Sequence, residues 1–369
     1  MTPFAALLSR IAAAIIIFAS AVTAITLPVG AALPYGGELA YFAGVPGRHT
    51  PRGEIRLLDV NRRVSFAPNF SGENSGGTYE FICWVAHGDS MVAFHQRSWL
   101  VIASANGANV ERLTSDDQLP TLWTLPTCWR GTAGIYLPLP AENRFYNLET
   151  NSLHTLPTDA YGSLTSDFDF SPDGTKVAFT GVFAGSPYSD VRPQLFMYDF
   201  ATDQTRTVFV SDRGGRANMM NPAWSPDGEW IAFTHRFRVL RINPATRETR
   251  IVYDFSATQN VEARPNINSI HWSPDDTMIA LEYIQPAPTY TDYDILIAHL
   301  ESGEITRLSS LTSDYISPDW SPDSRSLVFV SRNAQKSEIL LYDVISRSTV
   351  LLVSSSQLPI SPSWRPGLR

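Results

Sequence analysis

The stretch "PAWSPDGEWIAF", residues 222–233, places a tryptophan before a Ser-Pro-Asp-Gly turn and an apolar segment after it. Nearly the same sequence returns as "IHWSPDDTMIAL" around Trp272 and as "PDWSPDSRSLVF" around Trp320. Proline at the second position presets φ for a type I turn, and an aspartate side chain can bond to its own main chain. The segment that follows is rich in β-branched and aromatic residues, which favour strands. The motif therefore predicts a repeated strand–turn–strand unit.

The aromatic residue that opens this unit recurs along most of the chain. Phe170 replaces the tryptophan in "FDFSPDG", "PSWRPG" at Trp364 is a truncated copy, and weaker copies surround Trp84 and Trp129. The seven positions 84, 129, 170, 224, 272, 320 and 364 are separated by 45, 41, 54, 48, 48 and 44 residues. Such a period is typical of one four-stranded blade of a β-propeller.

Each unit predicts four strands, which we name A to D in chain order. In 318–355, "SPDW" is strand A, "SLVFVS" strand B, "EILLYDV" strand C and "TVLLVS" strand D. The last unit, at Trp364, has only strand A, whereas residues 37–67 read as B, C and D without an A. The two incomplete ends complement each other, because a C-terminal strand that pairs with the first hairpin removes an open sheet edge. We therefore predict an all-β fold, a seven-bladed β-propeller of four-stranded antiparallel blades, with six or eight blades as alternatives.

Composition narrows the classes of partner. The chain has a net charge of −8 and no run of Lys or Arg, which argues against binding to nucleic acid or to anionic lipid. A closed ring has no need of further subunits, so a monomer is expected. Residues 37–369 are predicted to form a single propeller domain.

Residues 1–36 are set apart from this domain. Arg10 is the only charged residue before Glu38, residues 11–19 are apolar, and Val22-Thr23-Ala24 resembles a cleavage site. One interpretation is a secretory signal cut after Ala24. The other is an uncleaved membrane anchor followed by a linker, because 11–33 is long enough to span a bilayer. Both place the domain outside the cytoplasm, in contact with a membrane only through this segment.

Residues 168–364 resemble the WD40-like repeats of the TolB type, also called PD40. The phrases "FSPDGTKVAF", "PAWSPDGEWIAF", "IHWSPDDTMIAL" and "PDWSPDSRSLVF" carry this resemblance, which fades over 37–160. The resemblance implies a propeller fold and an extracytoplasmic location. Bacterial TolB has six blades preceded by an α/β domain and acts as a protein-binding partner in the envelope. In contrast, the present sequence predicts seven units and has only about 36 residues before the first strand. We therefore do not transfer TolB's role in its complex to this protein.

In this topology the B–C and D–A connections emerge on one face, which we call the long-loop face. The B–C connections include 44–53, 181–193 and 284–294, and the D–A connections include 69–80, 211–221 and 256–268. Long loops on a rigid ring are the expected place for recognition. By residue type, the candidate contacts with a protein or peptide partner are Tyr188, Tyr290, Tyr293, Arg213 and Arg264.

Polar residues recur three positions before the strand-A aromatic. They are Asp167, Asn221, Ser269, Ser317 and Ser361. Stacked around the axis, they would form a polar channel rim for a small ligand, an ion or a peptide end. A water-filled channel is the simpler interpretation of the same residues.

Signals for catalysis are weak. No Gly-x-Ser-x-Gly elbow occurs, which argues against a prolyl-oligopeptidase-type hydrolase. A metal-dependent polysaccharide lyase needs clustered histidines, but the seven, at positions 49, 87, 95, 154, 235, 271 and 299, show no local metal-pair spacing. Cys83 and Cys128 precede strand-A tryptophans in consecutive blades. An exported location permits a disulfide between them, but we expect two buried thiols because the Cα separation that a disulfide needs is short for adjacent blades.

The sequence thus predicts a non-catalytic binding propeller without a catalytic residue, metal or cofactor. The alternatives are a propeller enzyme that acts on carbohydrate at the channel mouth and, if the N-terminal segment is retained, a sensor ectodomain.

Overall fold

Among the residues that the computed structural model describes, the elements are antiparallel strands and one 3-10 turn, η2 (Phe255–Ala257). The structure describes residues 37–45, 52–67, 79–85, 89–95, 99–106, 110–112, 136–139, 144–147, 152–155, 168–181, 192–212, 219–257, 266–286, 291–310, 312–355 and 358–366. The all-β class predicted from the repeat is confirmed for these residues. No helix among them is long and apolar enough to cross a bilayer.

Five sheets contain four strands in the chain order A, B, C, D. They are β4 (Tyr79–Val85), β5 (Ser90–His95), β6 (Trp99–Ser104) and β7 (Glu111–Arg112); β11 (Phe168–Phe170), β12 (Lys176–Gly181), β13 (Gln194–Asp199) and β14 (Gln204–Val210); β15 (Met219–Trp224), β16 (Ile231–His235), β17 (Arg238–Ile242) and β18 (Thr249–Asp254); β19 (Asn266–Trp272), β20 (Met278–Pro286), β21 (Thr291–His299) and β22 (Ile305–Leu308); and β23 (Asp314–Trp320), β24 (Ser326–Arg332), β25 (Ser337–Asp343) and β26 (Ser348–Ser355). The predicted division into A–D units is therefore present in each.

A sixth four-stranded sheet joins the two ends of the chain. The strand β27 (Leu358–Trp364) pairs with β1 (Glu38–Val45), which is followed by β2 (Arg52–Asp59) and β3 (Val64–Phe66). The register sets Trp364 opposite Leu39, and the Arg365 amide donates to the carbonyl of Glu38 over 2.8 Å. The pairing expected between the last strand and the first hairpin is present.

The seventh sheet has three described strands, β8 (Tyr136–Leu139), β9 (Arg144–Asn147) and β10 (Ser152–Thr155), which are antiparallel. The strand A expected around Trp129 lies in 113–135, outside the described residues. These three strands lie between β7 and β11 in the chain, where the unit of Trp129 was predicted.

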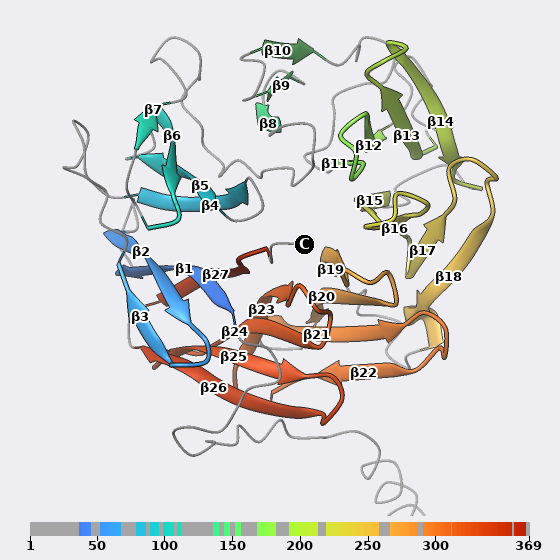
Figure 1. Cartoon of the computed structure of the whole chain (residues 1–369). Coiled ribbons are helices and arrows are strands. Elements are labelled where there is room, and N and C mark those ends of the chain that lie inside the picture. The colour runs from blue at the N-terminus through green and yellow to red at the C-terminus, as the bar shows by residue number, and fades with distance from the viewer. Residues whose placement is uncertain are drawn as a thin grey trace, which may run out of the picture.

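The sheets follow one another in chain order around a common centre, and in the six four-stranded sheets strand A lies nearest to it (Figure 1). The inner strands of neighbouring sheets contact each other: β11 contacts β15, β15 contacts β19, β19 contacts β23, and β23 contacts β27. An inner strand also contacts strand B or C of the preceding sheet, as β15 does with β12 and β23 with β21. The strands β1 and β2 in turn contact β4. The outermost strand of each sheet is strand D.

The strand-A tryptophans fill the space between adjacent sheets. Trp224 shares one core cluster with Leu195 and Met197 of the preceding sheet, and Trp364 shares another with Leu341. All five described strand-A tryptophans are at most 9% exposed: Trp84, Trp224, Trp272, Trp320 and Trp364. Burial of about 200 Å² at about 25 cal/mol per Å² stabilises each junction by roughly 5 kcal/mol as an upper bound. The strand-A tryptophans therefore act as wedges between neighbouring sheets.

Hydrogen bonds join the same inner strands in two alternative ways. In three junctions, the indole N–H of a strand-A tryptophan donates to a main-chain carbonyl in strand A of the preceding sheet. The acceptor is the residue just before the aromatic residue of that strand: Trp272 donates to Ala223 (3.0 Å), Trp320 to His271 (3.1 Å) and Trp84 to Ser363 (3.2 Å). Where that preceding residue is aspartate, its carboxylate instead accepts the main-chain N–H of the next tryptophan. Asp169 accepts from Trp224 over 2.7 Å, and Asp319 accepts from Trp364 over 2.8 Å.

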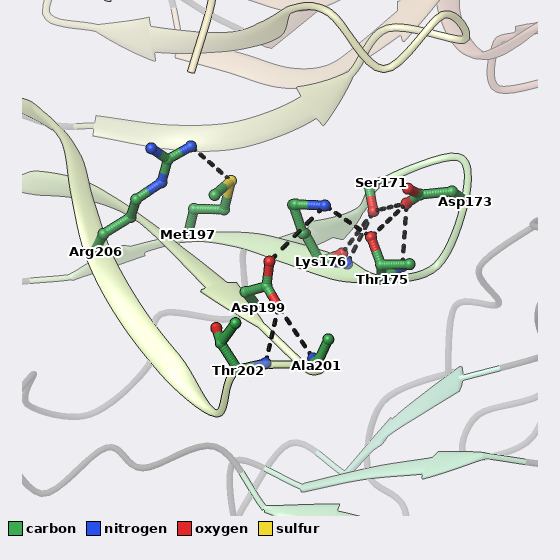
Figure 2. Close-up of polar contacts among 9 residues, drawn as sticks. All are labelled: Ser171, Asp173, Thr175, Lys176, Met197, Asp199, Ala201, Thr202 and Arg206. Atoms are coloured by element: carbon green, nitrogen blue, oxygen red, sulfur yellow. Dashed lines mark hydrogen bonds and ion pairs between the residues drawn. The ribbon is translucent and has the colours of Figure 1, made fainter. Parts of the chain in front are cut away.

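The Ser-Pro-Asp turn is closed by its own side chains. In the first copy, the Ser171 hydroxyl donates to Asp173 over 2.6 Å and accepts from the amide of Lys176 over 2.9 Å (Figure 2). The Asp173 carboxylate also accepts the amide of Thr175 over 3.1 Å. The serine–aspartate bond recurs in the turns at Ser225, Ser273 and Ser321. The predicted capping role of this aspartate is confirmed.

Candidate functional site

The structure describes the side chains of four of the ten predicted site residues. Tyr188, Tyr290, Arg213, Arg264 and Asp167 lie outside the described residues, and Ser361 is described only as part of the main chain of β27. Tyr293, Asn221, Ser269 and Ser317 can be placed.

Tyr293 lies near the start of β21, at the long-loop face, and is half-buried. Its amide donates to Asp314 at the start of β23 over 3.4 Å, and Asp314 forms an ion pair with Arg332 over 3.4 Å. The Arg332 side chain is 42% exposed. This polar group, which we call the Tyr293 cluster, joins two sheets at the face where the long connections emerge.

One predicted loop is largely a hairpin. We expected 284–294 to be a long B–C connection, but β20 and β21 pair up to Pro286 opposite Thr291 and leave only 287–290 between them. The alternation of Tyr293 and Ile295 with polar residues supports this extension, and proline is tolerated at a strand end. The connection 182–193 agrees with its predicted bounds.

Two predicted rim residues lie in β-bulges of the inner strands. Asn221 and Ser317 precede Pro222 and Pro318 and adopt φ of 55° and 54°, and the ladder register shifts around each. The Asn221 side chain donates to the carbonyl of Ile267 in the next sheet over 2.7 Å. This bond joins the inner strands β15 and β19 of neighbouring sheets.

A buried carboxylate that sequence reasoning missed lies beside this rim. Glu282 of β20 is 5% exposed and accepts from the Asn268 side chain over 2.7 Å and from the Ser317 amide over 2.9 Å. A third rim residue, Ser269, is hydrogen-bonded to His271 over 2.8 Å. The sequence signal that could have indicated Glu282 is its position as the one acidic residue inside the apolar strand "MIALEY".

A second buried pair joins two neighbouring sheets near the long-loop face. His235 Nε2 lies 3.0 Å from the Ser211 hydroxyl, and the two residues are 8% and 1% exposed. Burial and the nearby Arg236 lower the pKa of His235, although Asp212 opposes this shift. The arrangement favours a neutral imidazole, and the burial of Ser211 excludes it as an accessible nucleophile in this structure.

Within the described part of the chain, no three His, Cys, Asp or Glu side chains form a group that could hold a metal ion. The prediction of two unbonded cysteines concerns side chains outside that part, because Cys128 is not described and Cys83 is described only by its main chain in β4.

The fold is similar to known propeller structures. An oligogalacturonate lyase in complex with manganese is 13% identical, with a TM-score of 0.56, 86% of this chain covered and 85% of the other. An oligogalacturonate lyase from Vibrio parahaemolyticus is 12% identical, with a TM-score of 0.54 and 86% of each chain covered. TolB from Acinetobacter baumannii is 18% identical over 89% of this chain and 67% of its own, with a TM-score of 0.48.

No family model and no curated protein matches the sequence. At these identities the structural similarity shows a β-propeller fold alone, so neither the predicted PD40 family nor a function follows from it.

Proposed function

We propose that the chain is an extracytoplasmic, non-catalytic β-propeller that binds a protein or peptide partner through its long-loop face. In this proposal the domain has seven blades and is closed by the pairing of β27 with β1. The β8–β10 sheet supports the blade count, because it lies between β7 and β11 in the chain and has antiparallel B, C and D strands. A monomer with residues 1–36 as signal or anchor completes the proposal.

The contrast between the two faces is the observation that carries the binding function. On one face, the tight turns use their serine and aspartate side chains to close themselves. On the other face, strands are separated by the longer connections 67–78, 182–193 and 255–265. Polar groups already used in turns contribute little to recognition, whereas loops held by rigid strands are suited to it.

The Tyr293 cluster supplies described contact groups on that face. Tyrosine and arginine are enriched among the residues that dominate binding energy at protein interfaces. The partly exposed Arg332 guanidinium has further donors beyond its long contact with Asp314. We therefore assign Tyr293 and Arg332 as the described part of the binding surface, together with the predicted Tyr188, Tyr290, Arg213 and Arg264.

The test is affinity capture from envelope extract with the full chain. In one variant, Asn-Gly replaces residues 287–290, which removes Tyr290 but keeps Pro286 beside Thr291. A second variant is Arg332→Gln. The control is Ile345→Thr, which changes a 70% exposed residue on the opposite face. We expect a partner retained by wild type and control and lost from both other variants. Equal capture by all four proteins, or no specific capture, would refute this function.

The fold similarity to oligogalacturonate lyases favours one alternative, a carbohydrate-active enzyme. Incubation of the chain with oligogalacturonate and manganese tests it directly, because a lyase product carries a new double bond that absorbs ultraviolet light. A manganese-dependent increase in absorbance would replace the binding function by this one.

A further inference from the structure

Two positively charged side chains lie directly opposite each other on the two outer strands of one sheet. Arg241 of β17 is paired with Arg250 of β18, and Ala232 of β16 lies on the other side of Arg241 in the same row. Like charges at directly opposite positions destabilise a sheet. Natural proteins break such local rules mainly at functional sites and compensate for the cost elsewhere.

A single tryptophan side chain holds both guanidinium groups. The Cζ atoms of Arg241 and Arg250 lie 4.7 and 5.2 Å from the centroid of Trp230. Trp230 itself is half-buried and packs against the apolar cluster between this sheet and the next. Burial and the charge of Arg250 lower the pKa of Arg241, as expected for two cations held close together.

The surrounding carboxylates balance this pair only in part. Glu248 forms an ion pair with Arg250 over 2.7 Å. Within the described part of the chain, no carboxylate lies at ion-pair distance from Arg241. Glu248 and Asp227 act on Arg241 from farther away, while Asp227 Oδ1 accepts from the Ser225 hydroxyl and the Glu229 amide. Arg241 therefore keeps a guanidinium group without a directly paired carboxylate, on a chain whose net charge is −8.

The strand that carries Arg250 is the outermost strand of its sheet, and no described strand pairs with its other edge (Figure 1). Thr249, Arg250 and Ile251 are exposed, and Ile251 is 58% exposed although it is a large apolar residue. Since successive side chains of a strand point to opposite faces, Arg250 and Ile251 present a cation on one face and an apolar group on the other.

We propose that the outer edge of β18 binds an extended acidic peptide segment of a partner protein, which adds to the sheet as a further strand. An acidic side chain of this segment lies opposite Arg250 and continues the row Ala232–Arg241–Arg250. The neighbouring apolar side chain covers Ile251 on the other face. Main-chain bonds to the open edge supply affinity, and the charged row sets the register.

A free anion fits this site less well than a peptide. A phosphate or a small carboxylate could bind the two guanidinium groups, but it would leave Ile251 and the main-chain edge of β18 uncovered. The site lies on the side wall of the domain, at the outermost strand, and it is separate from the long-loop face. Its test therefore succeeds or fails independently of the proposed function.

The other long outer strands lack this combination. Arg206 of β14 contacts the sulfur of Met197 over 3.9 Å, and β26 contains no charged residue. Arg307 of β22 is bound to the buried Asp294 over 2.6 Å. Among the described outer strands, β18 alone joins a like-charge pair to an exposed apolar neighbour.

Fluorescence anisotropy with the full chain tests the proposal. The probe is a labelled Thr-Glu-Val-Glu-Val-Glu-Thr peptide, compared with the same peptide carrying Lys in place of Glu. The variants Arg241→Gln and Arg250→Gln each remove one guanidinium, and Glu248→Gln removes the internal competitor. Arg238→Gln is the control, because Arg238 lies on β17 like Arg241 but is paired with Asp254 over 2.7 Å. Circular dichroism verifies that each variant is folded.

We expect the acidic peptide to bind and the basic peptide not to bind. Arg241→Gln and Arg250→Gln should each weaken binding about tenfold, in line with the loss of one charge-assisted bond. Glu248→Gln should tighten it several-fold, and Arg238→Gln should leave it within about twofold. Equal binding of both peptides, an unchanged affinity in the two arginine variants, or no binding at millimolar protein would overturn the proposal. Displacement of the peptide by inorganic phosphate at equal concentration would show a free-anion site instead.

Discussion

The substitution Trp364→Ala tests whether the junction between the two chain ends stabilises the whole domain. Trp364 is 1% exposed and packs in one cluster with Leu39 of β1 and Leu341 of β25. Its main-chain bond to Asp319 does not involve the indole, so the substitution removes side-chain packing alone.

The magnitude follows from the buried area. Removal of about 200 Å² of apolar surface from the core costs roughly 5 kcal/mol at about 25 cal/mol per Å². Large-to-small substitutions of core tryptophan cost about 3–5 kcal/mol in practice. We therefore expect the free energy of unfolding to fall by about 4 kcal/mol. The same change at Trp230, which is half-buried outside the inner junctions, should cost less than half of that.

Urea denaturation followed by far-ultraviolet circular dichroism measures the loss, and amide hydrogen exchange localises it. Protection should decrease first in β1 and β27, while the amides of β16, two sheets beyond the junction, keep their protection. A loss below about 1 kcal/mol, or exchange that increases equally in all sheets, would show that closure at this junction does not govern stability.

Three further predictions concern the turns and the buried charges. Ser225→Ala should destabilise by about 1–3 kcal/mol, because the amide of Trp230 loses the hydroxyl that it donates to over 2.8 Å; exposed Ser346→Ala is the control in urea denaturation. Burial raises the pKa of Asp169 to about 7, so this group favours the folded state at pH 4 and loses that contribution as the pH rises to 7. The difference in unfolding free energy between wild type and Asp169→Asn should therefore decrease over that range. Arg307→Met should cost about 2 kcal/mol by removing the ion-pair partner of the fully buried Asp294, and Asp294→Asn in the same chain should recover part of that loss, measured by thermal unfolding.

The repeat made the fold predictable from sequence because its residues act locally. Serine and aspartate of the turn bond within five positions of each other, and the strand-A tryptophan packs wherever two sheets meet. Such contacts depend on the unit itself, so a recurring motif is enough to predict them. The match between the incomplete first and last units added the pairing of β1 with β27.

The candidate site was less predictable because its contacts join units. Glu282 meets the Ser317 amide of the next sheet, and Ser211 meets His235 across a sheet boundary. No spacing rule in the sequence fixes such pairs, since each depends on how two sheets are placed. The extent of the β20–β21 hairpin was also missed, because Pro286 and the polar residues near it read as loop signals.

The adjacency of Glu38 and Arg365 has a practical consequence for engineering. The amide of Arg365 bonds to the carbonyl of Glu38, and their side chains form an ion pair. A short linker could therefore join residues 37 and 366, and new termini could be opened in an exposed C–D turn such as 345–347. In such a circular permutant, every strand of the first sheet would belong to one continuous stretch of chain.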